Sequence, residues 1–269
     1  MKVQLLGTGG ADGIPSVFGT SRVSEYAISH GGKDVRTRTA ALVDDDLKID
    51  FGPDTLAQIA HFGLQADDWS GIVFTHSHDD HLCESELQYA LYPFTMLEFA
   101  PFTIYGNDVV LERIAARYPA WPFELVETRS FVPFSHNGYT ITPVHANHKL
   151  DEDAHNLIID DGSVKLLYGT DTGIWLEPTW QALAGHVFGG VVIECSEGFN
   201  RTDYYGHLDA HGCLEVMDRL RGMGCLAQDC KIVTTHHWHL GDATHAELES
   251  FFAPYGIEPG YDGLTFEIG

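Results

Sequence analysis

The sequence THSHDDH occupies residues 75–81 and directly follows the apolar run Ile72-Val73-Phe74. It holds three histidines and two aspartates. Imidazole nitrogen and carboxylate oxygen are ligands of divalent metals such as Zn²⁺ and Mn²⁺. Because side chains alternate along an extended chain, His76 and His78 are predicted to point the same way. The stretch therefore predicts a metal site directly after a buried strand.

Two further ligand types, Asp80 and His81, stand at what is predicted to be the start of a helix that runs to about Leu91. Their side chains can aim at a second point beside the first. The segment is therefore predicted to seat two metals roughly 3.5–4 Å apart, as in two-metal hydrolases. The alternative is a polar, solvated loop, which four ligand-type residues at this spacing disfavour.

The composition is that of a folded protein without a membrane span. The chain has 269 residues, of which 44% are hydrophobic, an ordinary share for a protein with a core. It has no long apolar run, and the strand-like start Val3-Gln4-Leu5-Leu6 is too short for a secretion signal. Five scattered cysteines without a Cys-x-x-Cys pair favour reduced thiols. We therefore expect a cytoplasmic location.

The charge is strongly negative. The chain carries 39 acidic and 15 basic residues, a formal net charge of −24. Nucleic acids and anionic lipids bind basic surfaces. We therefore expect no nucleic acid duplex, tRNA or membrane as partner, and a small substrate held at close range by metals. A halophile-like acidic surface is an alternative explanation of the charge.

Apolar runs, turn residues and helix caps predict a mixed order of strands and helices. Strands are predicted at residues 3–6, 40–43, 47–50, 72–75, 102–105, 124–127, 139–144, 156–159, 164–168, 190–193 and 231–234, and helices at 54–61, 81–91, 107–118, 179–183, 211–221 and 244–251. The glycine-rich loop 7–15 lacks the Gly-Lys-Ser/Thr of a phosphate-binding loop, so we expect a tight turn there. No linker divides the chain, so one domain, residues 1–269, is expected. Two sheets packed face to face with helices outside fit this order.

Three more candidate ligands each follow a predicted strand: His148, Asp171 and His236. Loops at strand ends commonly carry the chemistry of a fold. An aspartate between two metals can lend one oxygen to each, which suits Asp171. For each residue alone, a hydrogen-bonded loop position is the alternative, but their repeated placement after strands favours a common site.

These motifs resemble the metallo-β-lactamase superfamily of binuclear hydrolases, above all in residues 75–81 with Asp171 and His236. More narrowly, the chain resembles PhnP-like cyclic phosphodiesterases, and this likeness runs from residue 3 to the C-terminus. The segments that carry it are Leu6-Gly7-Thr8-Gly9-Gly10-Ala11, Asn147-His148, Asp171-Thr172, Glu194-Cys195-Ser196, Gly206-His207-Leu208-Asp209 and Gly260-Tyr261-Asp262-Gly263-Leu264.

The resemblance implies an α+β fold, an αββα sandwich with the site at one edge of the sheets. It implies two divalent ions, which would be manganese or zinc, with iron as a further option. It also leaves a homodimer as one option for the assembly. One ion would be held by His76, His78 and His148, and the other by Asp80, His81 and His236, with Asp171 bridging. The expected catalytic residues are Asp80 and His207, the latter donating a proton or gripping the phosphate.

The chain also departs from the narrower pattern. The cysteine cluster that forms a structural zinc site in PhnP-like proteins is absent, because this region reads Phe18-Gly19-Thr20-Ser21. His239 matches the late histidine of that site but lacks its partners, so we expect no structural zinc. No insertion resembles the tRNA-gripping arm of ribonuclease Z, which agrees with the expectation of no tRNA partner.

The predicted function is hydrolysis of a small, cyclic phosphodiester by a binuclear metal site. Asp50 would either orient the motif loop or serve as a buried structural residue. Three alternatives stay open: an ester, lactone, thioester or β-lactam hydrolase of the same fold, an iron-bound redox enzyme, and a non-catalytic metal-binding accessory protein of cofactor synthesis. Trp121, Trp175 and Trp238 are candidates for a substrate pocket, with core packing as the alternative.

Overall fold

The computed structural model of the chain describes residues 1–98, 100–201 and 203–269. Within these residues the strands form two sheets of seven strands each. The first has the order β14-β1-β2-β3-β4-β5-β6. Its strands are β1 (Lys2–Gly7), β2 (Ala40–Val43), β3 (Leu47–Ile49), β4 (Gly71–Val73), β5 (Thr103–Gly106), β6 (Glu124–Glu127) and β14 (Thr265–Glu267).

The second sheet has the order β13-β12-β11-β10-β9-β8-β7. Its strands are β7 (Phe134–His136), β8 (Tyr139–His145), β9 (His155–Asp160), β10 (Lys165–Gly169), β11 (Phe188–Glu194), β12 (Leu226–Thr235) and β13 (Ile257–Pro259). In both sheets antiparallel pairs give way to parallel pairs, such as β3 with β4 and β10 with β11. Both sheets are therefore mixed.

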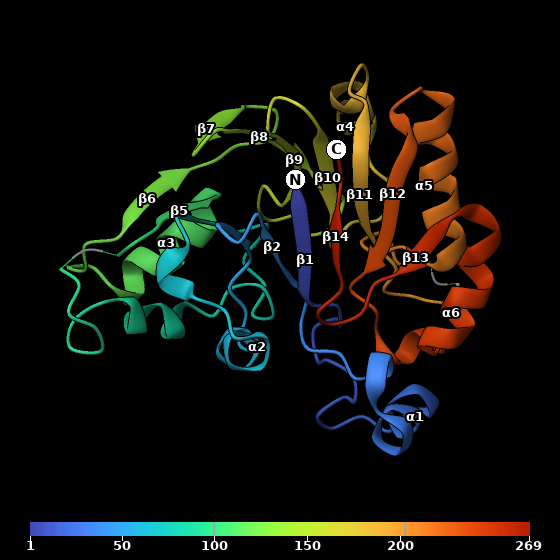
Figure 1. Cartoon of the computed structure of the whole chain (residues 1–269), viewed down its shortest axis with the longest axis horizontal. Helices are drawn as coiled ribbons and strands as arrows, with labels where there is room; N and C mark the ends of the chain where they lie inside the picture. The colour runs from blue at the N-terminus through green and yellow to red at the C-terminus, as the bar shows by residue number, and fades with distance from the viewer. Residues whose placement is uncertain (99, 202) are drawn as a thin grey trace.

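Helices flank the two sheets on their outer sides (Figure 1). The first sheet is covered by α2 (Thr55–Phe62) and α3 (Asp108–Arg117), and the second by α4 (Glu177–Leu183), α5 (Ala210–Gly222) and α6 (His245–Phe252). Helix α1 (Arg22–His30) lies beyond the lower edge of the sheets in Figure 1, where β1 ends. The predicted αββα sandwich is confirmed.

The strands bury both of their faces, because the core has three layers. Along β11, Val191 packs against the outer helices and Val192 packs between the sheets. Along β1, Leu5 packs between the sheets while Leu6 faces α2 and α3. Each fully buried side chain of this size contributes roughly 1.5–3 kcal/mol. Burial on both faces explains why the strands read as continuous apolar runs.

One helix was not predicted, and one expectation about a helix was wrong. The polar stretch 16–38 contains α1, which buries only Val23 and Ala27 among its apolar residues and so has a weak sequence signal. The helix expected to start at Asp80 and His81 is instead the 3₁₀ helix Glu84–Ala90. The Tyr118 hydroxyl donates to the carbonyl oxygens of Glu84 and Ser85, at 2.8 and 3.0 Å, which competes with α-helical bonding.

The expected helix caps have mixed outcomes. Asn107 accepts the backbone N–H of Val110 at 2.9 Å and so caps α3, as predicted. Asp54 precedes α2 but makes no side-chain cap. Its carboxylate instead accepts the backbone N–H of Arg38 at 2.8 Å and pairs with the Arg38 guanidinium at 3.0 Å. The aspartate therefore ties the loop before β2 to the start of α2.

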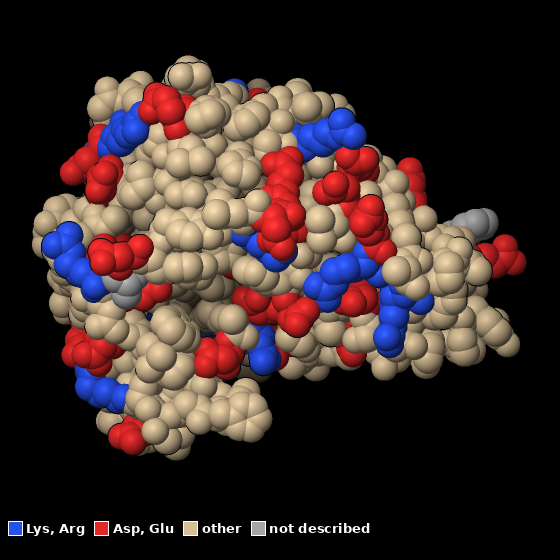
Figure 2. Space-filling model, turned by 180° about the vertical axis from the view of Figure 1, so that it is seen from behind, with Lys and Arg blue, Asp and Glu red and all other residues tan. Residues whose placement is uncertain are grey.

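The surface reflects the acidic composition. Figure 2 shows Asp and Glu side chains spread over the rear face, with a few basic clusters among them. In the part of the chain that the structure describes, no helix has the length and apolar character needed to cross a membrane.

Candidate metal centre

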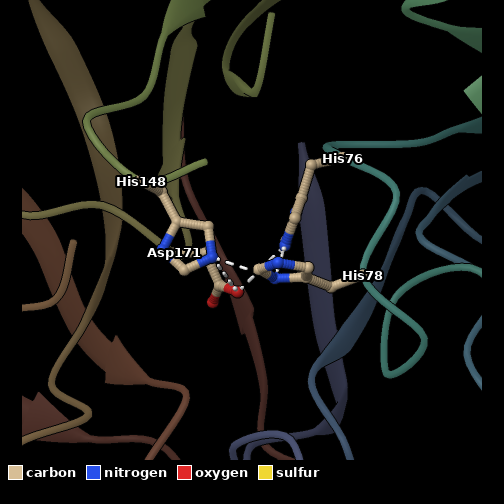
Figure 3. Close-up of side chains that lie close together, drawn as sticks. All are labelled: His76, His78, His148 and Asp171. Carbon is tan, nitrogen blue, oxygen red and sulfur yellow. Dashed lines mark hydrogen bonds and ion pairs between the residues drawn. The ribbon is translucent and has the colours of Figure 1, made fainter. Parts of the chain in front are cut away.

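The predicted ligands come together where loops from both sheets meet. The 75–81 loop follows β4, His148 follows β8, Asp171 follows β10 and His236 follows β12. In Figure 3, His76 and His78 point from one side towards His148 and Asp171 on the other. The structure brings all seven predicted donor residues together at this place.

The first donor cluster consists of His76, His78, His148 and Asp171. The Nδ1 atom of His78 lies 3.0 Å from Nε2 of both His76 and His148. The Oδ2 atom of Asp171 lies 3.3 Å from Nε2 of His76 and 3.6 Å from Nε2 of His148. Four ligands at metal–nitrogen distances near 2.1 Å in a tetrahedron are ~3.4 Å apart, so this spacing fits one ion.

The second donor cluster consists of Asp80, His81, Asp171 and His236. Nε2 of His81 lies 3.1 Å from the Oδ2 atoms of both Asp80 and Asp171. Nε2 of His236 lies 2.9 Å from Oδ1 of Asp171. The buried His81 Nε2 atom nevertheless has no hydrogen-bond partner among the described residues. Such an arrangement suits atoms that converge on an ion better than atoms bonded to one another. Asp171 belongs to both clusters.

Four of the histidine rings are oriented from outside by hydrogen bonds at Nδ1. The Nδ1 atom of His76 lies 3.0 Å from Thr75 Oγ1, and that of His81 lies 2.7 Å from Asp50 Oδ2. The Nδ1 atom of His148 lies 2.9 Å from the Gly206 carbonyl oxygen, and that of His236 lies 2.7 Å from Ser196 Oγ. Each ring thereby turns its Nε2 atom towards the centre, and such outer bonds fix ligand orientation in metal sites.

Asp50 anchors the motif loop as well as one ring. Its Oδ1 atom accepts the backbone N–H and the hydroxyl of Thr75 at 2.8 and 3.0 Å, and its Oδ2 atom faces His81. The loop is held on its other side by Glu152, which accepts the Ser77 N–H at 3.0 Å. Hydrogen bonds from Asp50 and Glu152 therefore hold the 75–81 loop from two sides.

The electrostatics show two buried anions that need positive partners. Burial alone would raise the pKa of Asp80 and of Asp171, but the charges on His81 and His236 hold both pKa values well below the usual range. Burial opposes a charge on His236, yet Asp171 outweighs it and raises the pKa of His236 to about 10. Burial and the neighbouring His81 lower the pKa of His76 to about 3, so this ring is neutral. Metal ions would replace protons on such histidines.

His207 lies beside the two clusters. Its Nδ1 atom pairs with Oε1 of the buried Glu194 at 2.7 Å, and its ring centroid is 4.8 Å from that of His148. Burial opposes a charge on this ring, but Glu194 outweighs burial and raises the pKa of His207. A cavity of about 590 Å³ is lined by His207 and His236. His207 therefore stands between the donor clusters and an open space.

Glu194 was not predicted as a site residue. It orients His207, accepts the backbone N–H of Thr172 at 2.7 Å and accepts the Ser196 hydroxyl at 2.5 Å. Ser196 in turn contacts His236. The signal for its role was present, because Glu194 directly follows the apolar strand predicted at residues 190–193 and is the last residue of β11.

The remaining candidates lie outside the two clusters. His239 contacts Asp12 at 3.0 Å and Ser21 at 3.0 Å, and belongs to none of the possible ligand groups among the described residues. Trp238 lines the cavity beside His207, as one of the three candidate pocket tryptophans. Trp175 is instead buried in the core against α4 and α5.

Comparison with known proteins identifies the family and the fold of this chain. The family described as the beta-lactamase superfamily domain matches residues 47–238. A search of curated proteins found no similar sequence.

Among solved structures, the chain is similar to a diphosphatase from the PhnP family, with TM-score 0.77 and 21% identity over 100% of this chain and 98% of that one. It is similar to Zn²⁺-bound PqqB from Methylobacterium extorquens, with TM-score 0.77 and 15% identity over 100% of both chains. Human tRNase Z, short form, matches with TM-score 0.67 and 15% identity, again over 100% of both chains. At these identities the likeness shows a shared fold.

Proposed function

Because this chain belongs to the beta-lactamase superfamily domain family, we propose that it is a binuclear metal-dependent hydrolase that acts on small phosphodiesters, cyclic ones included. The observation that carries the proposal is the pair of donor clusters that share Asp171, with the His207–Glu194 pair beside them. The ligands proposed are His76, His78 and His148 for one ion and Asp80, His81 and His236 for the other.

The charge balance of the donors favours an anionic substrate. Asp80 and Asp171 bring two negative charges, while neutral histidines bring none. Two bound divalent ions would supply a nucleophile at neutral pH by lowering the pKa of water, and would leave surplus positive charge for a phosphoryl group. The residues Asp50, Ser196 and Thr75 would keep the donor atoms in place through the hydrogen bonds described above.

His207 is proposed as the proton donor to the leaving group. Its Nδ1–H is occupied by Glu194 at 2.7 Å, which leaves Nε2 for the cavity. The carboxylate of Glu194 favours the protonated ring, and a protonated imidazole within reach of a leaving oxygen acts as a general acid. The same charge would grip a phosphate oxygen before reaction.

The proposal includes the setting of the protein. We expect a single domain, a cytoplasmic location, a small substrate and no nucleic acid duplex, tRNA or membrane partner. A homodimer is one option for the assembly. The net charge of −24 supports the exclusion of polyanionic partners. Manganese and zinc both suit the His/Asp donor set, and iron is a further option.

The test is turnover by metal-free protein reloaded with Mn²⁺ or Zn²⁺. We expect hydrolysis of bis(p-nitrophenyl) phosphate and of a 2′,3′-cyclic nucleotide that depends on metal and is abolished in Asp171→Ala. Hydrolysis of an ester, lactone or thioester with no phosphodiester turnover would favour the other hydrolase hypothesis. Two bound ions per chain with no turnover on any of these substrates would favour a non-catalytic accessory role.

A further inference from the structure

The cavity beside the metal centre has an unusual lining for a site that handles phosphate. It holds about 590 Å³ and extends from His207 and His236 to Asp12, Glu197, Tyr204 and Trp238. Cavities of this size bind small ligands. No lysine or arginine lines it within the described residues. We call the part formed by Asp12, Glu197, Tyr204 and Trp238 the acidic aromatic pocket.

Glu197 is a buried carboxylate without a partner. The residue is 6% exposed, and across residues 1–98, 100–201 and 203–269 its carboxylate makes no hydrogen bond or ion pair. Its backbone is fixed, because its N–H donates to the Leu208 carbonyl at 3.0 Å. A carboxylate in a largely buried side chain that makes no hydrogen bond or ion pair is costly, so a positively charged ligand would stabilise it.

Asp12 adds a second negative charge to the lining. Its Oδ2 atom is held by Nε2 of His239 at 3.0 Å. Its Oδ1 atom is buried and finds no hydrogen-bond partner in the described part of the chain. His239 therefore fixes the carboxylate while leaving one oxygen unsatisfied.

Two aromatic rings complete the pocket. Trp238 and Tyr204 both line the cavity, and the Tyr204 ring lies 5.5 Å from that of His207. Aromatic faces attract organic cations, with tryptophan the strongest among them, and carboxylates add to that attraction. Aromatic and acidic walls without a basic residue are complementary to a cation and unfavourable for a second phosphate.

We propose that the acidic aromatic pocket binds an organic ammonium group on the part of the substrate remote from the phosphorus. This inference rests on the proposed phosphodiesterase function. The phosphate would lie at the donor clusters, while the ammonium group would face Glu197 and the ring of Trp238. The substrate would then be a zwitterion, with its two charges matched to two oppositely charged ends of one cavity.

The first test compares two diesters with the same leaving group. These are p-nitrophenyl phosphorylcholine and its analogue p-nitrophenyl 3,3-dimethylbutyl phosphate, in which carbon replaces the ammonium nitrogen, so that the phosphate charge is kept and only the positive charge is lost. We expect kcat/KM to be ~10-fold or more higher for the choline ester, the scale of a cation–aromatic contact combined with a charge pair. Equal values of kcat/KM for the two diesters would overturn the proposal.

Variants then locate the preference. In Glu197→Gln the ratio of the two kcat/KM values should fall towards one. Glu112→Gln is the matched control, because it removes the same charge from an exposed position on α3 outside the lining of this cavity. A ratio that is unchanged in Glu197→Gln, or that falls equally in both variants, contradicts the role of this pocket.

A binding measurement separates this inference from the phosphodiesterase proposal. Isothermal titration of the metal-loaded protein with choline, against 3,3-dimethylbutanol as the uncharged control, needs no turnover. If neither diester is hydrolysed, the proposed function is wrong, and choline binding that is lost in Glu197→Gln would still support the pocket. Absence of choline binding together with absence of a kinetic preference would reject the pocket while leaving the metal-dependent activity intact.

Discussion

The metal centre and the acidic aromatic pocket share one cavity but treat buried charge in opposite ways. At the metal centre, Asp171 has nitrogens of His76, His81 and His236 within 3.3 Å, and the rings are held from behind by groups such as Asp50. In the pocket, the Glu197 carboxylate has no partner among the described residues. The side chains of the centre are fixed by their partners within the chain, whereas the Glu197 carboxylate is not.

The largest effect should follow from changing one of two neighbouring aspartates. Asp80→Asn removes a charged donor of the second cluster and should lower kcat/KM by ~10³-fold or more, with loss of one ion per chain. Asp79→Asn is the matched control, because the Asp79 side chain is 92% exposed and pairs only with Arg113. Metal content by plasma emission and turnover of bis(p-nitrophenyl) phosphate measure both effects.

The contrast between the metal centre and the pocket is contradicted if Asp80→Asn and Asp79→Asn have the same metal content and the same turnover. Equal metal content in Asp80→Asn and the unchanged protein would mean that the second cluster holds no ion. Equal losses in both variants would mean that the loop as a whole, and not the buried donor, decides metal affinity.

A smaller effect is expected at His207, which stands between the two regions. His207→Ala should lower kcat by ~10²–10³-fold, the usual contribution of a general acid, because it removes the imidazole that Glu194 holds beside the donor clusters. Both ions should be retained, since His207 is outside the two proposed ligand sets. Turnover with a p-nitrophenolate leaving group, which needs little protonation, should fall less than turnover with an alkoxide leaving group.

Loss of metal in His207→Ala would contradict this assignment. Glu194, His207 and His236 also lie close enough to hold a metal together, so metal content is the necessary control. A variant that keeps full turnover on alkoxide leaving groups would remove His207 from the mechanism.

The sequence revealed the metal centre more completely than the pocket, for a physical reason. Four of the ligands lie within residues 76–81: His76, His78, Asp80 and His81. The other three, His148, Asp171 and His236, each follow a strand whose apolar run is visible in the local sequence. Strands β8, β10 and β12 run in the same direction, so their carboxyl ends lie at one edge of the second sheet and local patterns were sufficient to predict a shared site.

The pocket has no comparable local signal. Glu197 stands two residues after Cys195 in a polar loop, and only the packing of that loop buries most of its side chain. Asp12 and Trp238 come from opposite ends of the chain and meet because the end of β1 contacts the segment after β12, where Gly10 donates to the His237 carbonyl at 2.8 Å. Whether a carboxylate is buried without a partner depends on contacts between distant segments, which no spacing rule gives.

Helix α1 shows the same limit at the level of secondary structure. Its start is marked by Ser21, which accepts the backbone N–H of Ser24 at 3.1 Å. The helix buries few apolar residues, because it packs against the short 3₁₀ helix His239–Gly241 and not against a sheet. An amphipathic pattern was therefore too weak to predict it.

A third buried charge allows the cost of an incompletely compensated ion to be measured without substrate. Lys48 on β3 is fully buried, and its Nζ atom donates to the backbone carbonyls of Ile49, at 3.2 Å, and of Asp50. Burial lowers the pKa of Lys48 to about 7, and the nearby charge of Asp50 only partly opposes this effect. Lys48 is thus intermediate between Asp171, which has charged partners, and Glu197, which has none.

The smallest predicted effect is the pH dependence of stability that Lys48 causes. The unfolded chain holds this proton up to about pH 10.5, whereas the folded protein releases it near pH 7. Between these values the unfolded state binds more protons, so the free energy of unfolding should rise with pH. Lys48→Met should flatten this rise, while Lys2→Met, at an exposed lysine on β1, should keep it. Urea titrations of metal-free protein at pH 7 and pH 9 measure the difference.

An equal rise in both variants would mean that Lys48 keeps its proton when buried, and carbonyl partners alone would then be sufficient for a charge in this core. In that case the absence of a partner at Glu197 would no longer by itself argue for a cationic ligand, and the choline preference would have to carry the pocket alone.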